Sequence, residues 1–428
     1  MIDTIKPLGL DFTKSLHGHV RVETRDRWTG KIVDSQEKHN LVTNALQRMI
    51  LTNAWATIAM GSDWTPLYAK LLGTVLLFDN SLTASADNYK FPSSAKLVGY
   101  AGQGSNTTDP IGGSYNGEES VRTSNGFTTV WDFTTSQANG TISALARTSH
   151  AFTEFPVCSG NQAYTLDSGA PNGALNNFYS ALGYDETNKY LYFARTSAQT
   201  LNNITYSVNE LFKVPLNFNK IGFNTAMPPA SEVTRVKLLS SSDGTTTARY
   251  FTYDPFANNF VYATGTTLHI VAMDGTHTTK SATGTSGGLA ITENYYWRST
   301  GTTVYRIDKS NTANIQTYTV SYADYIAPLE NDVVVTWSTS SYEVSFVYPD
   351  GTIKKMTVAR NGSLTGQHRP NLGVFHSTQS QSGNTGTQPN WQWLWPSAHY
   401  LGTIANLDSP VTKTSSQTMK ITYTLTES

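Results

Sequence analysis

The chain has 428 residues, of which 14% are charged and 11% are aromatic, and its formal net charge is -1. The weak charge argues against a protein that binds a nucleic-acid backbone, because such a protein needs a basic patch. The aromatic content argues against intrinsic disorder. Serine, threonine, asparagine and glycine supply much of the polarity, as is typical of strands joined by many turns. We therefore expect a mainly β protein of more than one domain, with a large core.

The sequence carries no signal for an internal disulfide, for secretion or for a membrane span. Cys158 is the single cysteine, so it can form neither an internal disulfide nor a cysteine-based zinc site. The first residues lack a basic segment followed by an apolar core. No apolar run approaches the roughly 18 residues of a membrane-spanning helix. We expect synthesis in a reducing cytoplasm, no membrane insertion and no cofactor.

The first third of the chain predicts a hairpin, a helix and a buried strand. Polar and apolar residues alternate over residues 18–33 around a turn at Trp28, which indicates two half-buried strands. Asn40 then precedes apolar residues at helical spacing, and we assign it as the N-cap of a long helix that ends near Ile58. The continuous apolar run over residues 74–78 is typical of a buried strand.

A second hairpin is predicted around Asn139 and Gly140. Residues 127–133 and 141–146 both alternate between apolar and polar side chains. An Asn-Gly pair between two such runs favours a tight turn, because both residue types tolerate positive φ. We therefore expect these two runs to pair with each other.

The middle of the chain repeats itself loosely between about residues 183 and 351. An Asp-Gly-Thr triplet begins at Asp243, Asp274 and Asp350, each time near an aromatic or apolar run. Asp-Gly favours hairpin turns, and repeating units of about 40 residues with several short strands are typical of propeller blades. A single blade cannot bury its apolar face, so the blades must stack. Residues 151–395 are therefore predicted to form a propeller-like domain.

Two sets of residues are candidates for binding sites. Trp391, Trp393 and Trp395 share one face of a predicted strand, where their indoles could form a platform for sugar rings or seal the end of the middle domain. His17 and His19 also share a strand face, so they are weak candidates for a metal ion, and a solvated strand face is the simpler explanation of both. The sequence contains no nucleophile elbow, zinc-protease, phosphate-loop or calcium-loop motif, and we assign no catalytic residue.

Several segments resemble tail-associated virion proteins of phages that infect Gram-positive bacteria. They lie near both chain ends, at residues 39–46, 76–79, 130–142, 406–414 and 419–423. The resemblance covers about residues 1–150 and 396–428 and leaves out the middle. It implies that these two parts form one attachment module, β-rich and sandwich-like with one long helix. Residues 151–395 would then be inserted into that module.

The resemblance also implies a function. We expect a structural protein of the phage tail, baseplate or fibre, located in the virion and assembled in the host cytoplasm. Its expected partners are other virion proteins, further copies of itself and a glycan of the host surface, and not nucleic acid. The expected role is binding without enzymatic activity. The alternatives are a virion depolymerase that degrades surface glycan and a purely structural connector.

Overall fold

The computed structural model describes the chain almost entirely as β-strands. The described residues are 16–43, 46, 72–88, 91–102, 108–123, 126–148, 158–159, 178–185, 187–201, 204–215, 234–239, 252–282, 288–329, 331–338, 343–357, 369–372, 375–380, 391–396 and 401–427. Within these ranges, no helix has the length and hydropathy that crossing a membrane requires.

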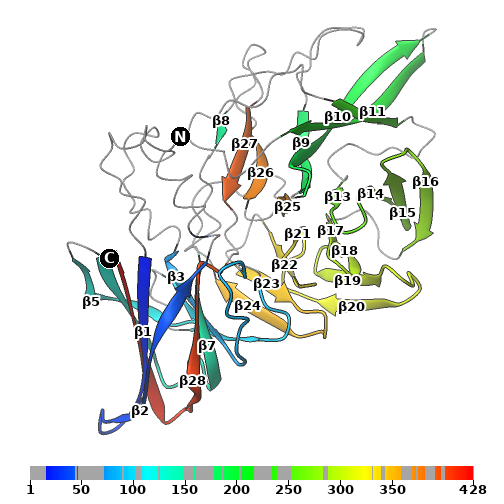
Figure 1. Cartoon of the computed structure of the whole chain (residues 1–428). Coiled ribbons are helices and arrows are strands. Elements are labelled where there is room, and N and C mark those ends of the chain that lie inside the picture. The colour runs from blue at the N-terminus through cyan, green and yellow to red at the C-terminus, as the bar shows by residue number, and fades with distance from the viewer. Residues whose placement is uncertain are drawn as a thin grey trace, which may run out of the picture.

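Nine strands form one curved antiparallel sheet in the order β4-β3-β7-β28-β2-β1-β29-β6-β5 (Figure 1). We call it the barrel sheet. Its strands are β1 (Leu16–Asp26), β2 (Ile32–Val42), β3 (Thr74–Phe78), β4 (Leu97–Ala101), β5 (Ser114–Thr123), β6 (Gly126–Phe133), β7 (Gly140–Thr148), β28 (Thr403–Lys413) and β29 (Gln417–Glu427). The sheet nearly closes on itself, because Tyr100 in β4 forms a parallel bridge with Gly112, just before β5.

The two ends of the chain meet in this sheet. β1 pairs with β29 along its whole length and with β2 on its other side. β28 pairs with β2 and with β7. Alternate residues of β1 point into the barrel, where Val20 and Val22 are fully buried. The predicted hairpin over residues 18–33 is therefore confirmed, with its turn at Trp28.

The predicted fold class of a sandwich-like module with one long helix was wrong. The nine strands form a single, nearly closed sheet, and no long helix occurs among the described residues. Asn40, which we expected to cap the helix, lies within β2 opposite Gly18. Its amide donates a hydrogen bond to the Tyr423 hydroxyl, so its side chain joins strands of the barrel. Most of the predicted helical segment, residues 47–58, lies outside the described residues.

The predicted pairing of residues 127–133 with residues 141–146 was also wrong. Both runs are strands, β6 and β7, but they are not neighbours in the sheet. β6 pairs with β29 and β5, whereas β7 pairs with β3 and β28. The connection between them carries a polar turn in which Gln137 accepts a hydrogen bond from the Thr134 amide at 2.9 Å. This turn spans the barrel end in place of a tight hairpin.

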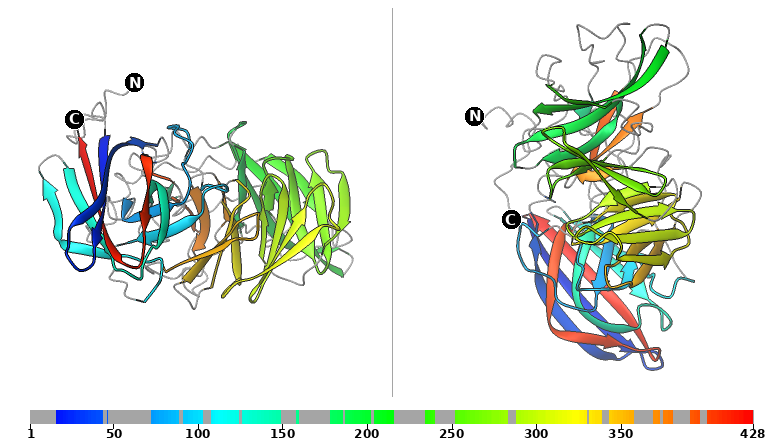
Figure 2. Two further views of the ribbon diagram at one scale, coloured as in Figure 1. Left: turned by 90° about the horizontal axis from the view of Figure 1, so that it is seen from below. Right: turned by 90° about the vertical axis from the view of Figure 1, so that its right-hand side faces the viewer.

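The middle of the chain forms five four-stranded antiparallel sheets among the described residues (Figures 1 and 2). Blade 1 contains β9 (Phe178–Asp185), β10 (Tyr190–Leu201), β11 (Ile204–Pro215) and β12 (Thr234–Leu239), and blade 2 contains β13 (Thr252–Asp254), β14 (Asn259–Thr264), β15 (Thr267–Ala272) and β16 (His277–Ser281). Blade 3 contains β17 (Gly288–Ile291), β18 (Tyr295–Thr300), β19 (Thr303–Asp308) and β20 (Ile315–Thr319), and blade 4 contains β21 (Tyr325–Pro328), β22 (Val334–Trp337), β23 (Glu343–Val347) and β24 (Ile353–Thr357).

Blade 5 closes the ring with strands from two distant parts of the sequence. It contains β25 (Arg369–Leu372), β26 (Phe375–Ser380), β27 (Trp391–Pro396) and, as its last strand, β8 (Cys158–Ser159). The first strand of each blade touches the first strands of both neighbouring blades, and β25 of blade 5 touches β9 of blade 1. A ring of four-stranded sheets with their first strands at the centre is a β-propeller, so the repeated middle of the chain has a propeller fold.

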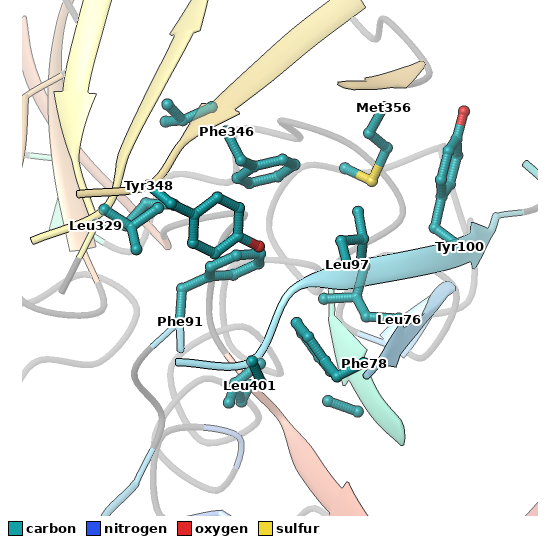
Figure 3. Packing of buried hydrophobic residues seen from close by; sticks show 14 of the residues in the cluster. Leu76, Phe78, Phe91, Leu97, Tyr100, Leu329, Phe346, Tyr348, Met356 and Leu401 are labelled. Carbon is teal, nitrogen blue, oxygen red and sulfur yellow. The ribbon is translucent and has the colours of Figure 1, made fainter. Parts of the chain in front are cut away.

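One hydrophobic cluster joins the barrel sheet to blade 4 (Figure 3). Phe91, from the connection between β3 and β4, stacks on Phe346 of blade 4 with ring centroids 4.7 Å apart. Around them, Lys96 forms an ion pair with Asp350 at 2.9 Å, and the Tyr100 hydroxyl accepts a hydrogen bond from the Thr357 amide at 2.8 Å. We call this contact the seam. It fixes the propeller against the barrel through apolar packing and polar contacts together.

Replacing Phe91 with alanine tests the seam. Phe91 is 2% exposed, and removing a buried phenylalanine ring costs about 3–5 kcal/mol. We expect denaturant unfolding to show that loss, with the transitions of barrel and propeller moving apart. Phe256→Ala is the matched control, because that ring is 56% exposed; its effect should stay within about 1 kcal/mol. Equal effects of the two variants would contradict the role of the seam.

The buried amine of Lys413 is expected to make the stability of the protein depend on pH. Its side chain is buried at the barrel end, where its amine donates a 2.8 Å hydrogen bond to the Asn139 side chain. Burial lowers the pKa of Lys413 from 10.5 to about 8, so the unfolded chain holds an extra proton between these pH values. The free energy of unfolding therefore rises as the pH increases from about 8 to 10, by roughly 1–3 kcal/mol. Lys413→Met should remove this rise in denaturation curves, and a persistent rise would contradict the assignment.

Candidate binding face

Two kinds of turn meet on one face of the propeller. In a four-stranded antiparallel blade, the turn between the first two strands and the turn between the last two lie at the same end. In five of the described turns, an aspartate carboxylate accepts hydrogen bonds from backbone amides two or three residues later, as in Asx-turns. Asp185, Asp254 and Asp308 each bind two such amides, and Asp274 and Asp350 each bind one. We call this end of the propeller the turn face.

Asp254 and Lys309 link blades 2 and 3 at the turn face. Asp254 is the last residue of the first strand of blade 2 and is fully buried, whereas Lys309 follows the third strand of blade 3. The Lys309 amine lies 2.7 Å from Asp254 Oδ2, while Oδ1 accepts the amides of Phe256 and Ala257. The Lys309 amine also lies over the Phe256 ring at 5.2 Å. Both carboxylate oxygens of Asp254 are therefore engaged.

Burial and charge set the protonation of this pair and its surroundings. Burial lowers the pKa of Lys309, and the negative charge of Asp254 opposes that shift. The centroid of the Tyr296 ring lies 5.4 Å from the Lys309 amine. Burial, assisted by the Asp254 charge, raises the pKa of Tyr296 to about 12. The phenol therefore stays neutral at physiological pH beside a carboxylate held by the lysine.

A pair of tyrosines joins blades 1 and 2 in the same region. The rings of Tyr192 and Tyr253 stack with centroids 4.4 Å apart. Burial and the nearby charge of Asp185 raise the pKa of Tyr192 to about 12, and burial raises the pKa of Tyr253 as well. The Tyr253 hydroxyl donates a hydrogen bond to Asn258 Oδ1 at 2.9 Å. These contacts hold neighbouring blades together, and the neutral phenols are hydrogen-bonding groups.

The exposed part of this region is suited to binding. Phe256 is the apex of the Asp254 turn, and its ring is 56% exposed directly above the paired lysine. An exposed aromatic ring on a hydrogen-bonded turn is suited to packing against the apolar faces of a ligand. Beneath the ring, Asp254 and Lys309 are engaged with each other.

The three predicted tryptophans lie in β27, the third strand of blade 5. Their backbones pair Trp391 with Ser380, Trp393 with Thr378 and Trp395 with His376. Trp393 also pairs with Ser159 of β8 on the other side. The run therefore lies in the blade that closes the ring, and the choice between a sugar platform and a sealed junction stays a prediction.

The two predicted histidines lie in β1, on the outer wall of the barrel, away from the blades. His19 lies opposite His39 of β2, and its Nε2 lies 3.6 Å from a carboxylate oxygen of Glu37. Among the residues that the structure describes, no group of three or more His, Cys, Asp or Glu side chains has the spacing of a metal site.

Sequence analysis missed the cluster around Asp254 and Lys309. The structure shows a second repeated turn, in which an aspartate is followed four residues later by a residue with positive φ. Lys189 follows Asp185 in this way, and Asn258 follows Asp254, with φ values of 59° and 50°. The Asp-Gly-Thr triplets at Asp274 and Asp350 lie, as expected, in turns between the last two strands of blades 2 and 4. Asp243 lies outside the described residues.

Comparisons with known proteins give the fold context alone. No family model matches the chain, and no curated protein matches it. Among solved structures, it is similar to a streptogramin B lyase, with 12% identity over 79% of this chain and 95% of that one and a TM-score of 0.29. It is also similar to an inactive virginiamycin B lyase from Staphylococcus aureus with quinupristin (9% identity, 69% and 99% of the two chains, TM-score 0.28) and to a nidogen–laminin complex (9%, 54% and 93%, TM-score 0.27). With TM-scores this low, the propeller assignment rests on the strand order and the contacts around the ring.

The ion pair between blades 2 and 3 is testable by a double-mutant cycle. Lys309→Met leaves the fully buried Asp254 carboxylate without its cation, so we expect a loss of about 2–4 kcal/mol in unfolding free energy. Asp254→Asn with Lys309→Met should cost clearly less than the sum of the single variants, because no buried charge is left. Urea unfolding of the four proteins gives the coupling energy. Simple additivity would show that the pair does not stabilise the ring.

Proposed function

We propose that this chain is a structural protein of a phage virion, in the tail, baseplate or fibre, and that its propeller presents a surface that binds the host cell. The observation that carries the proposal is the location of the segments that resemble tail-associated proteins. Residues 39–42, 76–78, 130–133, 406–413 and 419–423 all lie in strands of the barrel sheet. The part of the chain with the resemblance is thus a unit built from both ends.

The seam supports a display role for the propeller. The stacked rings of Phe91 and Phe346, together with the Lys96–Asp350 ion pair, hold blade 4 at a fixed position against the barrel. Asn331 of blade 4 also donates a 3.1 Å hydrogen bond to the backbone carbonyl of Phe91. A module that is anchored in a particle can therefore hold the turn face in a defined orientation.

The turn face supplies the kind of contacts that a multivalent binder uses. Phe256 is exposed above Lys309, on a turn whose backbone amides bind Asp254. Contacts of this type are weak singly, and several copies on one particle convert weak binding into avidity. We infer that the ligand is a glycan of the host surface, since sugars combine apolar ring faces with many hydroxyls.

The experiment is adsorption competition with the purified full-length chain. Pre-incubating host cells with the chain should block adsorption of the phage, and Phe256→Ala should weaken this block several-fold because it removes the exposed ring. Lys31→Ala, at the hairpin tip of the barrel sheet, is the matched control and should block as the wild type does. Gold-labelled antibodies against the chain should decorate the tails of intact particles.

Other outcomes identify the alternatives. Release of reducing sugar from host walls would show a depolymerase. Tail decoration without cell binding or competition would show a connector that contacts only other virion proteins. Particles without the chain would overturn the virion assignment itself.

A further inference from the structure

The outer wall of the barrel brings together two histidines that are far apart in the sequence. His19 of β1 and His39 of β2 occupy directly opposite positions in the antiparallel register. Their ring centroids lie 5.4 Å apart, with the ring planes at 63°. His39 is exposed, and the His19 side chain is 39% exposed. Along the sequence, His17 is the histidine that shares a strand face with His19. The strand pairing places His39 opposite His19 on the neighbouring strand.

The spacing of the two rings fits one metal ion. Zn²⁺ binds imidazole nitrogen at about 2.0–2.1 Å, which places two rings on neighbouring positions of a tetrahedral ion with centres roughly 5 Å apart. The observed separation is within a small side-chain rotation of that value, and the exposure of both rings leaves them free to rotate. The rigid sheet beneath holds the two backbones at a fixed distance, which lowers the entropy cost of chelation.

One carboxylate also lies next to His19. A Glu37 carboxylate oxygen lies 3.6 Å from His19 Nε2. Arg21 contacts Glu37 at 3.3 Å through Nε and Glu23 at 2.8 Å through Nη2. Glu37 therefore lies beside His19, with one carboxylate oxygen toward the imidazole and the other toward Arg21.

A second histidine pair in the molecule has a different arrangement. In blade 2, His269 Nδ1 lies 3.0 Å from His277 Nε2, which is the distance of a hydrogen bond. The His269 ring is nearly buried and stacks on Tyr262 with centroids 4.4 Å apart. Both nitrogens are thus engaged with each other, and this pair provides an internal control.

We propose that His19 and His39 form a surface binding site for one divalent transition-metal ion of the class that prefers imidazole, namely Zn²⁺, Ni²⁺ or Cu²⁺. The two imidazoles hold the ion, and water fills the remaining positions. The site is independent of the function proposed for the propeller.

The test is calorimetric titration of the tag-free, full-length chain with Ni²⁺ and with Zn²⁺. We expect one binding site per chain, or one per two chains if a second copy completes the coordination. His19→Ala and His39→Ala should each weaken binding at least tenfold. His17→Ala and His277→Ala are the matched controls and should leave the affinity unchanged. Far-ultraviolet circular dichroism checks that each variant is folded.

A spectroscopic measurement identifies the ligands directly. The electron paramagnetic resonance spectrum of bound Cu²⁺ should show coupling to two imidazole nitrogens in the wild type and to one in His39→Ala. The proposal is overturned if no ion binds, if His39→Ala binds as tightly as the wild type, or if binding is lost with His17→Ala or His277→Ala.

Discussion

The hydrophobic cluster at the seam is the constraint on which the arrangement of this molecule depends. It contains residues from β3, β4 and β7 of the barrel and from β21 to β24 of blade 4 in one continuous core. Apolar burial has no preferred direction, so the surrounding polar contacts define the orientation. Lys96 provides one of them, because its amine lies over the Tyr348 ring at 4.3 Å while it pairs with Asp350.

The barrel itself depends on contacts between the two ends of the chain. β29 pairs with β1 on one side and with β6 on the other. Neither β1 nor β6 is therefore paired on both edges until the C-terminal strand has docked. A buried arginine illustrates the point: the Arg147 guanidinium lies 4.6 Å from both the Trp131 and the Tyr423 ring centroids. These three residues come from β7, β6 and β29, so the interior is assembled only when the last strand has docked. Such long-range pairing is slow to form.

Local pattern predicted the strands and turns well, because alternation and turn chemistry are properties of neighbouring residues. It failed wherever the choice of partner decided the structure. Residues 127–133 and 141–146 are both strands, yet each pairs with segments that no local pattern specifies. Asn40 has a residue type suited to a cap, but strand pairing across from Gly18 overrides that preference. The link between Asp254 and Lys309 was equally invisible, since it joins turns of different blades.

Strand pairing also explains how a ring can interrupt a barrel without disturbing it. The barrel strand before the ring is β7 and the one after it is β28, and these two are paired, with Arg147 opposite Thr403. The Gly402 amide donates a 2.7 Å hydrogen bond to the Arg147 carbonyl, so the chain leaves and re-enters the barrel at adjacent points. The ring repeats this arrangement, because β8 at its start pairs with β27 at its end. Since both units close on their own ends, the seam is the contact that fixes one against the other in the described part of the chain.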